Sequence, residues 1–300
     1  MTARSRGFTL AEIAVAVAVL ALLLGGLLIP LSTQLEGARQ REAQRALELI
    51  REALVGYALA NGRLPCPAAP NVPAGVLDGN GINGGAEQRN AAAPGACTNT
   101  VLSTAPPISP IDPQRASGVV PFVTLGVPEL DPWGQRFSYV VDHALADSAS
   151  IALLVGVDED CFNPSAANIR SFCAPSNQPG ARLEIRTRTA GGPEVQVARE
   201  MVAVVISHGR NGYYGWRANG ALPTPNPVAN ARDELINAVS LGGAVFTSIG
   251  KFLIDRPQVR DASPGCDDVT AGASLCEFDD LVIGLSRSLL VGRMASAGRL

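Results

Sequence analysis

The feature that most constrains this chain is a long apolar segment near its N-terminus with an acidic residue at its start. Residues 13–29 contain no charged side chain, and Glu12 directly precedes them. Residues 8–29 are long enough to span a membrane as one helix, since about 20 residues suffice. An unpaired carboxylate at the centre of such a helix costs roughly 2.5 to 3.5 kcal/mol. The pattern therefore predicts a membrane helix in which a positively charged group pairs with Glu12.

Cleavage between Gly7 and Phe8 would supply that group, because the new α-amino group is positively charged near neutral pH and lies one helical turn from Glu12. The segment G-F-T-L-A-E at residues 7–12 resembles the processing site of type IV prepilins and type II secretion pseudopilins. The resemblance implies that a prepilin peptidase cuts after Gly7 and methylates Phe8, and that Glu12 is the assembly carboxylate. It also implies partners: other pilins or pseudopilins in a helical filament, and an assembly platform in the bacterial inner membrane.

Two other interpretations of the N-terminus explain less. A secretory signal peptide ends its apolar core with a small-residue cleavage site, whereas here an acid interrupts the start of the core and no such site clearly ends it. A simple single-pass anchor leaves Glu12 unexplained. Arg4 and Arg6 precede the span and no basic residue follows before Arg39. The positive-inside rule therefore places the N-terminus in the cytoplasm and the large C-terminal part in the periplasm, or outside the cell after assembly.

The six cysteines fit an exported protein. They lack the C-x-x-C and histidine spacings of zinc sites, and an oxidising compartment favours disulfides. Several pairings are possible, and we favour sequential pairs because each flanks a turn-rich segment. These pairs are Cys66 with Cys97, Cys161 with Cys173, and Cys266 with Cys276.

The helical pattern continues past the apolar run. Apolar residues recur at steps near three and four over residues 31–57, and charged residues fill the other face. We expect one helix over about residues 8–60 with a kink or local melting at Pro30, and two helices separated there are the alternative. The predicted divisions are a leader at 1–7, a transmembrane and assembly segment at 8–30, an amphipathic segment at 31–61, a Pro/Gly-rich connecting loop at 62–118 and a β-rich head at 119–300.

The whole chain predicts an α+β fold of pilin type, in which the long helix packs on an antiparallel β-sheet head with long disulfide-bonded loops. Short runs rich in β-branched and aromatic residues follow one another without intervening helices, which favours antiparallel pairing. We expect strands at 119–125, 135–141, 151–157, 183–189, 201–207 and 281–285, and helices at 231–239 and 288–297.

Two further segments resemble parts of major pseudopilins. D-P-W-G at 131–134, followed by Phe137 and Tyr139, predicts a turn that leads into a strand, with Trp133 packed in the core. S-H-G-R-N-G at 207–212 is similar to the loop that precedes a calcium-binding segment in those proteins. This chain departs from them in its much greater length and in Asn211, which stands where an acid is expected.

Calcium is the one cofactor that the sequence suggests. Two acidic pairs bracket the predicted disulfide between Cys266 and Cys276, which could bring them together as the hard oxygen ligands that calcium prefers. A second acidic group at 158–160 precedes Cys161, and both groups can also be solvated loop residues. The residues of the first group are Asp267, Asp268, Asp279 and Asp280.

The sequence does not predict an enzyme. It has only two histidines, no G-x-S-x-G or H-E-x-x-H motif, and a net charge of −3 that does not indicate nucleic-acid binding. Two functions remain open: a structural filament subunit, and a tip-located module that binds a surface, DNA or secreted cargo. The large head favours a minor subunit, and secretion, adhesion, motility and DNA uptake are all compatible with it.

Overall fold

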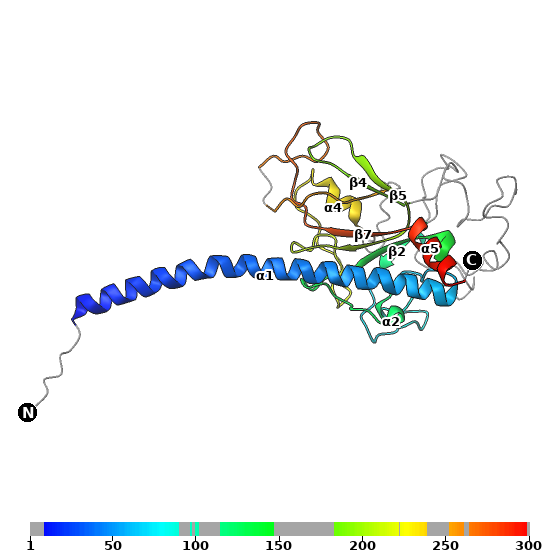
Figure 1. Ribbon diagram of the computed structural model, residues 1–300, viewed down its shortest axis with the longest axis horizontal. Coiled ribbons are helices and arrows are strands. Elements are labelled where there is room, and N and C mark those ends of the chain that lie inside the picture. Colours follow the sequence, from blue (N-terminus) through cyan, green and yellow to red (C-terminus); the bar gives the residue numbers. More distant parts are fainter. Residues whose placement is uncertain are drawn as a thin grey trace, which may run out of the picture. The chain divides into compact units, whose positions relative to one another are not determined.

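The computed structural model describes residues 9–89, 97, 100–101, 115–146, 183–221, 223–238, 252–260 and 264–298, without the side chains of 21–33, 100–101, 115 and 143–144. The chain divides into two compact units, Met1–Glu42 and Ala43–Leu300, which are described separately. Helix α1, Leu10–Asn61, begins in the first unit and ends in the second (Figure 1). It continues through Pro30, so the prediction of one helix is confirmed over that of two.

The second unit is built on one sheet, whose described strands follow the order β1-β2-β3-β5-β4-β6, with β7 also paired to β5. Neighbouring strands are antiparallel except β4 and β6, which are parallel. The strands are β1 Thr100–Val101, β2 Arg115–Val119, β3 Ser138–Asp142, β4 Leu183–Thr187, β5 Val195–Ser207, β6 Phe252–Ile254 and β7 Leu281–Ser286. A mixed α+β fold with an antiparallel-rich sheet is therefore confirmed.

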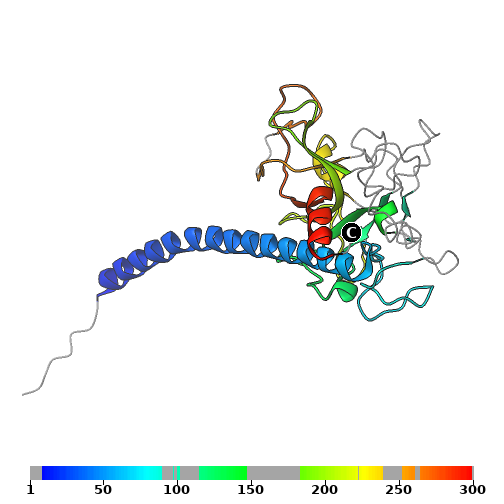
Figure 2. The same cartoon turned by 45° about the vertical axis from the view of Figure 1, so that its right-hand side comes forward.

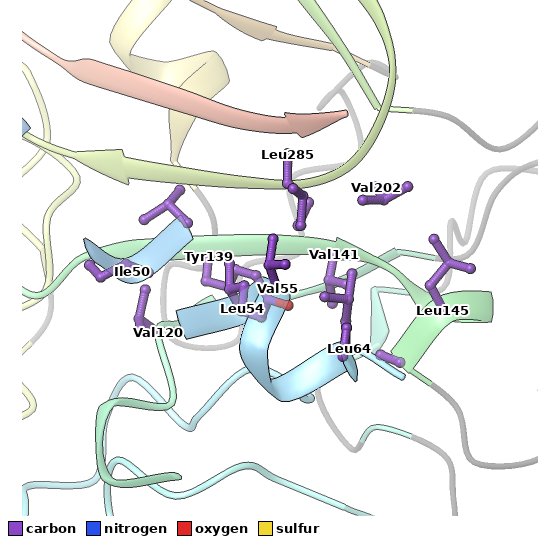
Figure 3. Close-up of a cluster of buried hydrophobic side chains, with 14 of the residues drawn as sticks. Ile50, Leu54, Val55, Leu64, Val120, Tyr139, Val141, Leu145, Val202 and Leu285 are labelled. Carbon is purple, nitrogen blue, oxygen red and sulfur yellow. The ribbon is translucent and has the colours of Figure 1, made fainter. Parts of the chain in front are cut away.

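Two helical segments cover one face of this sheet. The part of α1 within the second unit lies beside α5, Arg287–Ser296, in both views (Figures 1 and 2). Ile50 and Leu54 of α1 are fully buried and pack with Tyr139, Val141 and Leu285 of the sheet (Figure 3). Within the second unit, the amphipathic pattern over residues 43–57 therefore marks a helix face that packs on the sheet. Leu290 and Met294 of α5 join the same core.

Alternation along β5 gives the sheet a second buried face. Ala203 and Val205 belong to the core beneath α1, whereas Val204 and Ile206 pack with Leu253 of β6. Successive side chains of a strand point to opposite faces, so the apolar residues of β5 pack alternately into two hydrophobic cores, one on each face of the sheet. A continuous apolar strand is what a sheet covered on both sides requires.

The registers of β5 decide which residues meet at one end of the sheet. Ser138 of β3 lies opposite Ile206, and Leu281 of β7 lies opposite Ser207. His208 follows β5 directly, and Asp280 directly precedes β7. The two ladders therefore bring Ser138, His208 and Asp280 close together.

Several predicted elements differ from the observed ones. Residues 119–125 were expected to form a strand, but the strand β2 ends at Val119 and α2, Phe122–Leu125, follows. Pro121 lacks the N–H that a ladder requires and stands at the start of α2, while Gly126 ends it with a φ of 66°. Both β1 and most of β2 lie in the predicted connecting loop, and β6 was not predicted because its run is short. The predicted strand at 151–157 lies outside the described residues.

The remaining predicted elements occur with shifted ends. Helix α4, Arg232–Asn237, and α5 lie where helices were expected, and α3, His143–Ala146, is an additional short helix. The D-P-W-G segment forms the expected turn, in which the Gly134 N–H donates to the Asp131 carbonyl at 3.0 Å. Trp133 is half-buried.

Among the described residues, two disulfides link loops of the second unit. Cys66 bonds to Cys97, and Cys266 bonds to Cys276. These are two of the three sequential pairs that the sequence favours, and the third pair, Cys161 and Cys173, lies outside the described residues. The first bridge ties the loop after α1 to residue 97, and the second closes the loop that precedes β7.

Candidate functional site

The N-terminal motif forms a capping box at the start of α1. The backbone N–H and the hydroxyl of Thr9 both donate to Glu12 Oε2 at 2.9 Å. The Glu12 N–H donates back to Thr9 Oγ1 at 3.3 Å. This reciprocal pattern satisfies donors that a helix N-terminus leaves unpaired. The Glu12 carboxylate therefore has local partners within one chain, while Gly7 and Phe8 lie outside the described residues.

Large apolar side chains of the first unit are exposed along α1. Their exposed fractions run from 50% for Val19 to 90% for Leu10. The set comprises Leu10, Ile13, Val15, Val17, Val19, Leu20 and Leu35. Among the described residues, no helix has both the length and the apolar character needed to cross a membrane.

The second candidate site is a cluster of three buried carboxylates. Glu234 of α4 meets Asp279 and Asp280, which precede β7, and one oxygen from each lies within 4.8 Å of the others. Their exposed fractions are 0%, 7% and 2%. A Cβ on Gly209 would lie 2.4 Å from the Asp279 carbonyl, so only glycine allows this close approach of the loop after β5. Glu234 and the distant pair Asp279 and Asp280 are thus packed into one acidic site.

Asparagine side chains and one backbone N–H hold these carboxylates in place. Asn211 donates from its backbone to Asp279 Oδ2 at 2.9 Å and from Nδ2 to Glu234 Oε1 at 2.7 Å. Asn226 Nδ2 donates to the other Glu234 oxygen at 2.8 Å, and Asn237 Nδ2 donates to Asp280 Oδ2 at 2.8 Å. The fixing groups are neutral, so they orient the carboxylates without balancing their charge.

The negative charges of the three carboxylates have no compensating positive charge among the described residues. Burial, followed by the charge of Asp280, raises the pKa of Glu234 to about 8. Burial also raises the pKa of Asp279 to about 7, with a further contribution from Asp280 and against the lowering effect of the Asn211 N–H. Asp279 Oδ1 and Asp280 Oδ1 have no hydrogen-bond partner among the described residues. Within the described ranges, none of the three carboxylates forms an ion pair with an arginine.

A neighbouring acidic group is, by contrast, paired with arginines. Arg256 Nε lies 2.6 Å from Asp233 Oδ2, and its Nη2 lies 3.4 Å from Asp268 Oδ1. Arg188 Nη2 lies 3.0 Å from Asp233 and 2.5 Å from Glu194. Removing one partner of such a buried ion-pair network destabilises the fold strongly, because it leaves a buried charge without a partner. This group therefore has the composition of a structural network, unlike the cluster beside it.

The structure divides the four aspartates that the sequence grouped together. Asp268 is fully buried, pairs with Arg256 and accepts from the Cys276 N–H at 3.0 Å. Asp267 caps a turn, where it accepts from the backbone N–H groups of Val269 and Thr270 at 2.7 and 3.0 Å. Only Asp279 and Asp280 enter the carboxylate cluster.

Glu234 is the member of the cluster that sequence reasoning missed. It lies in a short helical segment, where an acidic residue is usually solvated, and nothing in its local pattern indicates burial. The acidic group at 158–160 lies outside the described residues.

A buried serine and histidine lie beside the cluster. Ser138 Oγ is 2.7 Å from His208 Nε2, and His208 Nδ1 is 3.5 Å from Asp280 Oδ1. The same three residue types form hydrolase triads, which need a nucleophile that a substrate can reach. Ser138 and His208 both have an exposed fraction of 0%. The arrangement therefore has a structural rather than a nucleophilic geometry.

The comparison with protein families concerns the N-terminus. The family model of the prokaryotic N-terminal methylation motif matches residues 2–28, which include Gly7, Phe8 and Glu12. The chain carries the type IV pilin and pseudopilin signature. A prepilin-type N-terminus implies processing by prepilin peptidase, assembly with other pilins and a membrane-anchored N-terminus, in a family that is generally structural rather than catalytic. No curated protein and no solved structure matches this chain.

Proposed function

We propose that this protein is a minor pilin or pseudopilin, a structural subunit of a type IV pilus-like or type II secretion filament. The observation that carries the proposal is the methylation motif at residues 2–28, which leads into α1. Prepilin peptidase cleaves after Gly7 and methylates Phe8. Residues 8–30 hold the precursor in the inner membrane, and the head is periplasmic before assembly.

Assembly exchanges the partner of Glu12. In the single chain its carboxylate accepts two hydrogen bonds from Thr9. The methylated amine of Phe8 in a neighbouring subunit is positively charged, and a charge-assisted bond is stronger in a low-dielectric bundle. The exposed apolar side chains of α1 provide the packing surface of that bundle. Such a contact is heterologous, so its repetition builds a helical filament.

Two acidic residues of α1 allow a matched test of assembly. Glu12→Ala is expected to leave membrane insertion unchanged and to reduce the amount of subunit in sheared filaments, measured by immunoblot. Glu48, which pairs with Arg51 at 2.5 Å and is exposed, gives the control variant Glu48→Ala. The control is expected to assemble like the wild type. Wild-type incorporation of Glu12→Ala would contradict the assigned role.

Processing is tested separately from assembly. Mass spectrometry of the protein from cells that contain a prepilin peptidase is expected to give a chain that begins with methylated Phe8. A chain that keeps residues 1–7 in those cells contradicts the proposal. A peptidase-deficient strain provides the unprocessed reference.

A tip-located binding module is the second candidate function. The size of the unit Ala43–Leu300 supports it, because so large a head is difficult to pack along the whole filament shaft. Its ligand would be a surface, DNA or secreted cargo. Copy number in purified filaments decides between the positions: a few copies per filament fit the tip, and an abundance equal to that of the main subunit contradicts both the minor and the tip assignment.

We also propose that the head binds calcium at Glu234, Asp279 and Asp280. The three residues offer the hard oxygen ligands that calcium prefers, held within 4.8 Å. A buried group of like charges is unfavourable unless a cation or protons neutralise it. The buried Asp279 Oδ1, which has no hydrogen-bond partner among the described residues, supports a cation over a hydrogen-bonded network. Calcium would stabilise the contact between α4 and the start of β7.

The calcium site is tested by thermal unfolding of the full chain in detergent micelles. A ligand present at about 100 times its Kd stabilises a fold by about 2.7 kcal/mol, so calcium is expected to raise the Tm relative to EGTA. Glu234→Gln is expected to remove most of this shift. Asp267→Asn is the control, because Asp267 caps a separate turn, and it should keep the shift. An unchanged wild-type Tm in millimolar calcium rules out the site.

A further inference from the structure

We propose that His208 is a positioning residue of the cation site, which orients the Asp280 carboxylate through its Nδ1–H group. The inference rests on the calcium site proposed above. His208 and Ser138 are fully buried, and Asp280 is 2% exposed. They come from the end of β5, the start of β3 and the residue before β7, and the ladders of β5 bring them together.

Each ring nitrogen of His208 faces one polar neighbour. Nε2 lies 2.7 Å from Ser138 Oγ, and Nδ1 lies 3.5 Å from Asp280 Oδ1. Among the described residues, neither Nδ1 nor Oδ1 has another hydrogen-bond partner. The second oxygen, Asp280 Oδ2, is held by Asn237 Nδ2 at 2.8 Å. The unpartnered oxygen and the unpartnered ring nitrogen are therefore 3.5 Å apart, and a small movement of Asp280 would allow a hydrogen bond between them.

This arrangement favours one tautomer of a neutral imidazole, which carries one proton on its two nitrogens. With the proton on Nε2, the Nδ1 lone pair would face a buried carboxylate oxygen, which is unfavourable. With the proton on Nδ1, His208 donates to Asp280 while the Ser138 hydroxyl donates to Nε2. The Ser138 hydroxyl, both ring nitrogens of His208 and Asp280 Oδ1 then all take part in hydrogen bonds. Ser138 selects the tautomer, and the tautomer fixes the direction in which Asp280 is held.

Such an outer hydrogen bond has a defined effect on a metal site. Carboxylates that bind metals are themselves held by hydrogen bonds, and removing the outer partner typically lowers metal affinity by about 10- to 100-fold. Asp280 has one such bond from Asn237, and His208 would supply the second. The role assigned to His208 is therefore affinity through orientation, without contact with the cation.

Two amide substitutions form a matched pair for this role. Both His208→Asn and His208→Gln remove the ring, so they lose similar packing. Asparagine places its amide nitrogen near the Nδ1 position and keeps a donor toward Asp280, whereas glutamine places it near Nε2 and keeps the contact with Ser138. Calcium titration of the full chain in detergent is expected to show an affinity loss of about 10- to 100-fold for His208→Gln and a clearly smaller loss for His208→Asn. Equal affinities in the two variants overturn the proposal.

The imidazole spectrum provides a readout that general destabilisation does not change. The full chain has two histidines, so 15N-histidine labelling gives two rings, and His143→Gln assigns them. In the calcium-bound chain, the His208 ring is expected to carry its proton on Nδ1, and Ser138→Ala is expected to weaken that preference. A ring without a proton on Nδ1 overturns the proposal.

The outcomes separate this inference from the calcium site. A wild-type chain that binds no calcium removes the site and the role of His208 together. A wild-type chain that binds calcium, with equal affinities in the two amide variants, removes only the role of His208.

Discussion

Replacing Glu234 with glutamine tests the electrostatics of the carboxylate cluster most directly. Burial and the charge of Asp280 raise the Glu234 pKa from 4.5 to about 8. Since one pKa unit corresponds to about 1.4 kcal/mol, the ionised side chain destabilises a cation-free fold by roughly 4 to 5 kcal/mol above about pH 8. Glutamine removes the charge but keeps only one of the hydrogen bonds from Asn211 and Asn226, which costs about 1 to 3 kcal/mol. The net gain expected for Glu234→Gln at about pH 9 is therefore roughly 2 kcal/mol.

The sign of the effect depends on pH. Because the folded pKa is raised, the protonated carboxyl group contributes stability below the unfolded value of 4.5, and this contribution is lost as pH rises through about 8. At about pH 5 the wild-type Glu234 side chain is already mostly neutral in the folded state. Glu234→Gln then removes no unfavourable charge, and it only loses a hydrogen bond relative to the wild type. In EGTA the variant should be less stable than the wild type at the lower pH and more stable at the higher pH.

The assay is thermal unfolding of both full chains in detergent, with EGTA or calcium, at about pH 5 and pH 9. A gain of roughly 2 kcal/mol corresponds to a Tm increase of about 4 to 8 °C for a domain of this size. With calcium at the higher pH the order should reverse, because the variant lacks a charged ligand. A Tm difference between variant and wild type that is the same at both pH values in EGTA would refute the electrostatic reasoning.

Three further substitutions test the fold and the capping box. Ile50→Ala removes a fully buried side chain beneath the sheet and should lower the free energy of unfolding by about 2 to 5 kcal/mol, measured by urea titration; a change below about 1 kcal/mol contradicts this packing. Arg256→Met leaves Asp233 without its 2.6 Å partner and should cost about 3 to 5 kcal/mol in the same titration, whereas a neutral effect would show that the network is dispensable. Thr9→Val removes the hydroxyl that bonds Glu12 and should weaken the first turn of α1 by about 1 kcal/mol, seen as faster amide exchange there; unchanged exchange argues against the capping box.

Local sequence was sufficient for the elements whose signal is continuous along the chain. The helix ending at Asn61 follows from apolar periodicity and the glycine and proline after it. The G-F-T-L-A-E segment indicates prepilin-type processing from sequence alone, because the residues of the motif are contiguous in the chain. Turn chemistry also works locally, as at Asp131, where the side chain accepts from the N–H groups two and four residues later. The strand predicted at 119–125 was wrong for a local reason too, because Pro121 lacks the N–H that a strand ladder requires.

The carboxylate cluster was decided by tertiary structure alone. Their proximity in the sequence predicts one site for the four aspartates. In the structure Asp268 forms an ion pair with Arg256, and only Asp279 and Asp280 of the four lie beside Glu234. The register of β5 with β7 and the position of α4 decide which acidic side chains share a site. The residues near Glu234 in the sequence specify neither of them. The same registers place Ser138 beside His208. The sequence by itself determined the N-terminal motif and the long helix, because their interactions are local, while the buried site required pairing between distant strands, whose partners the local pattern does not specify.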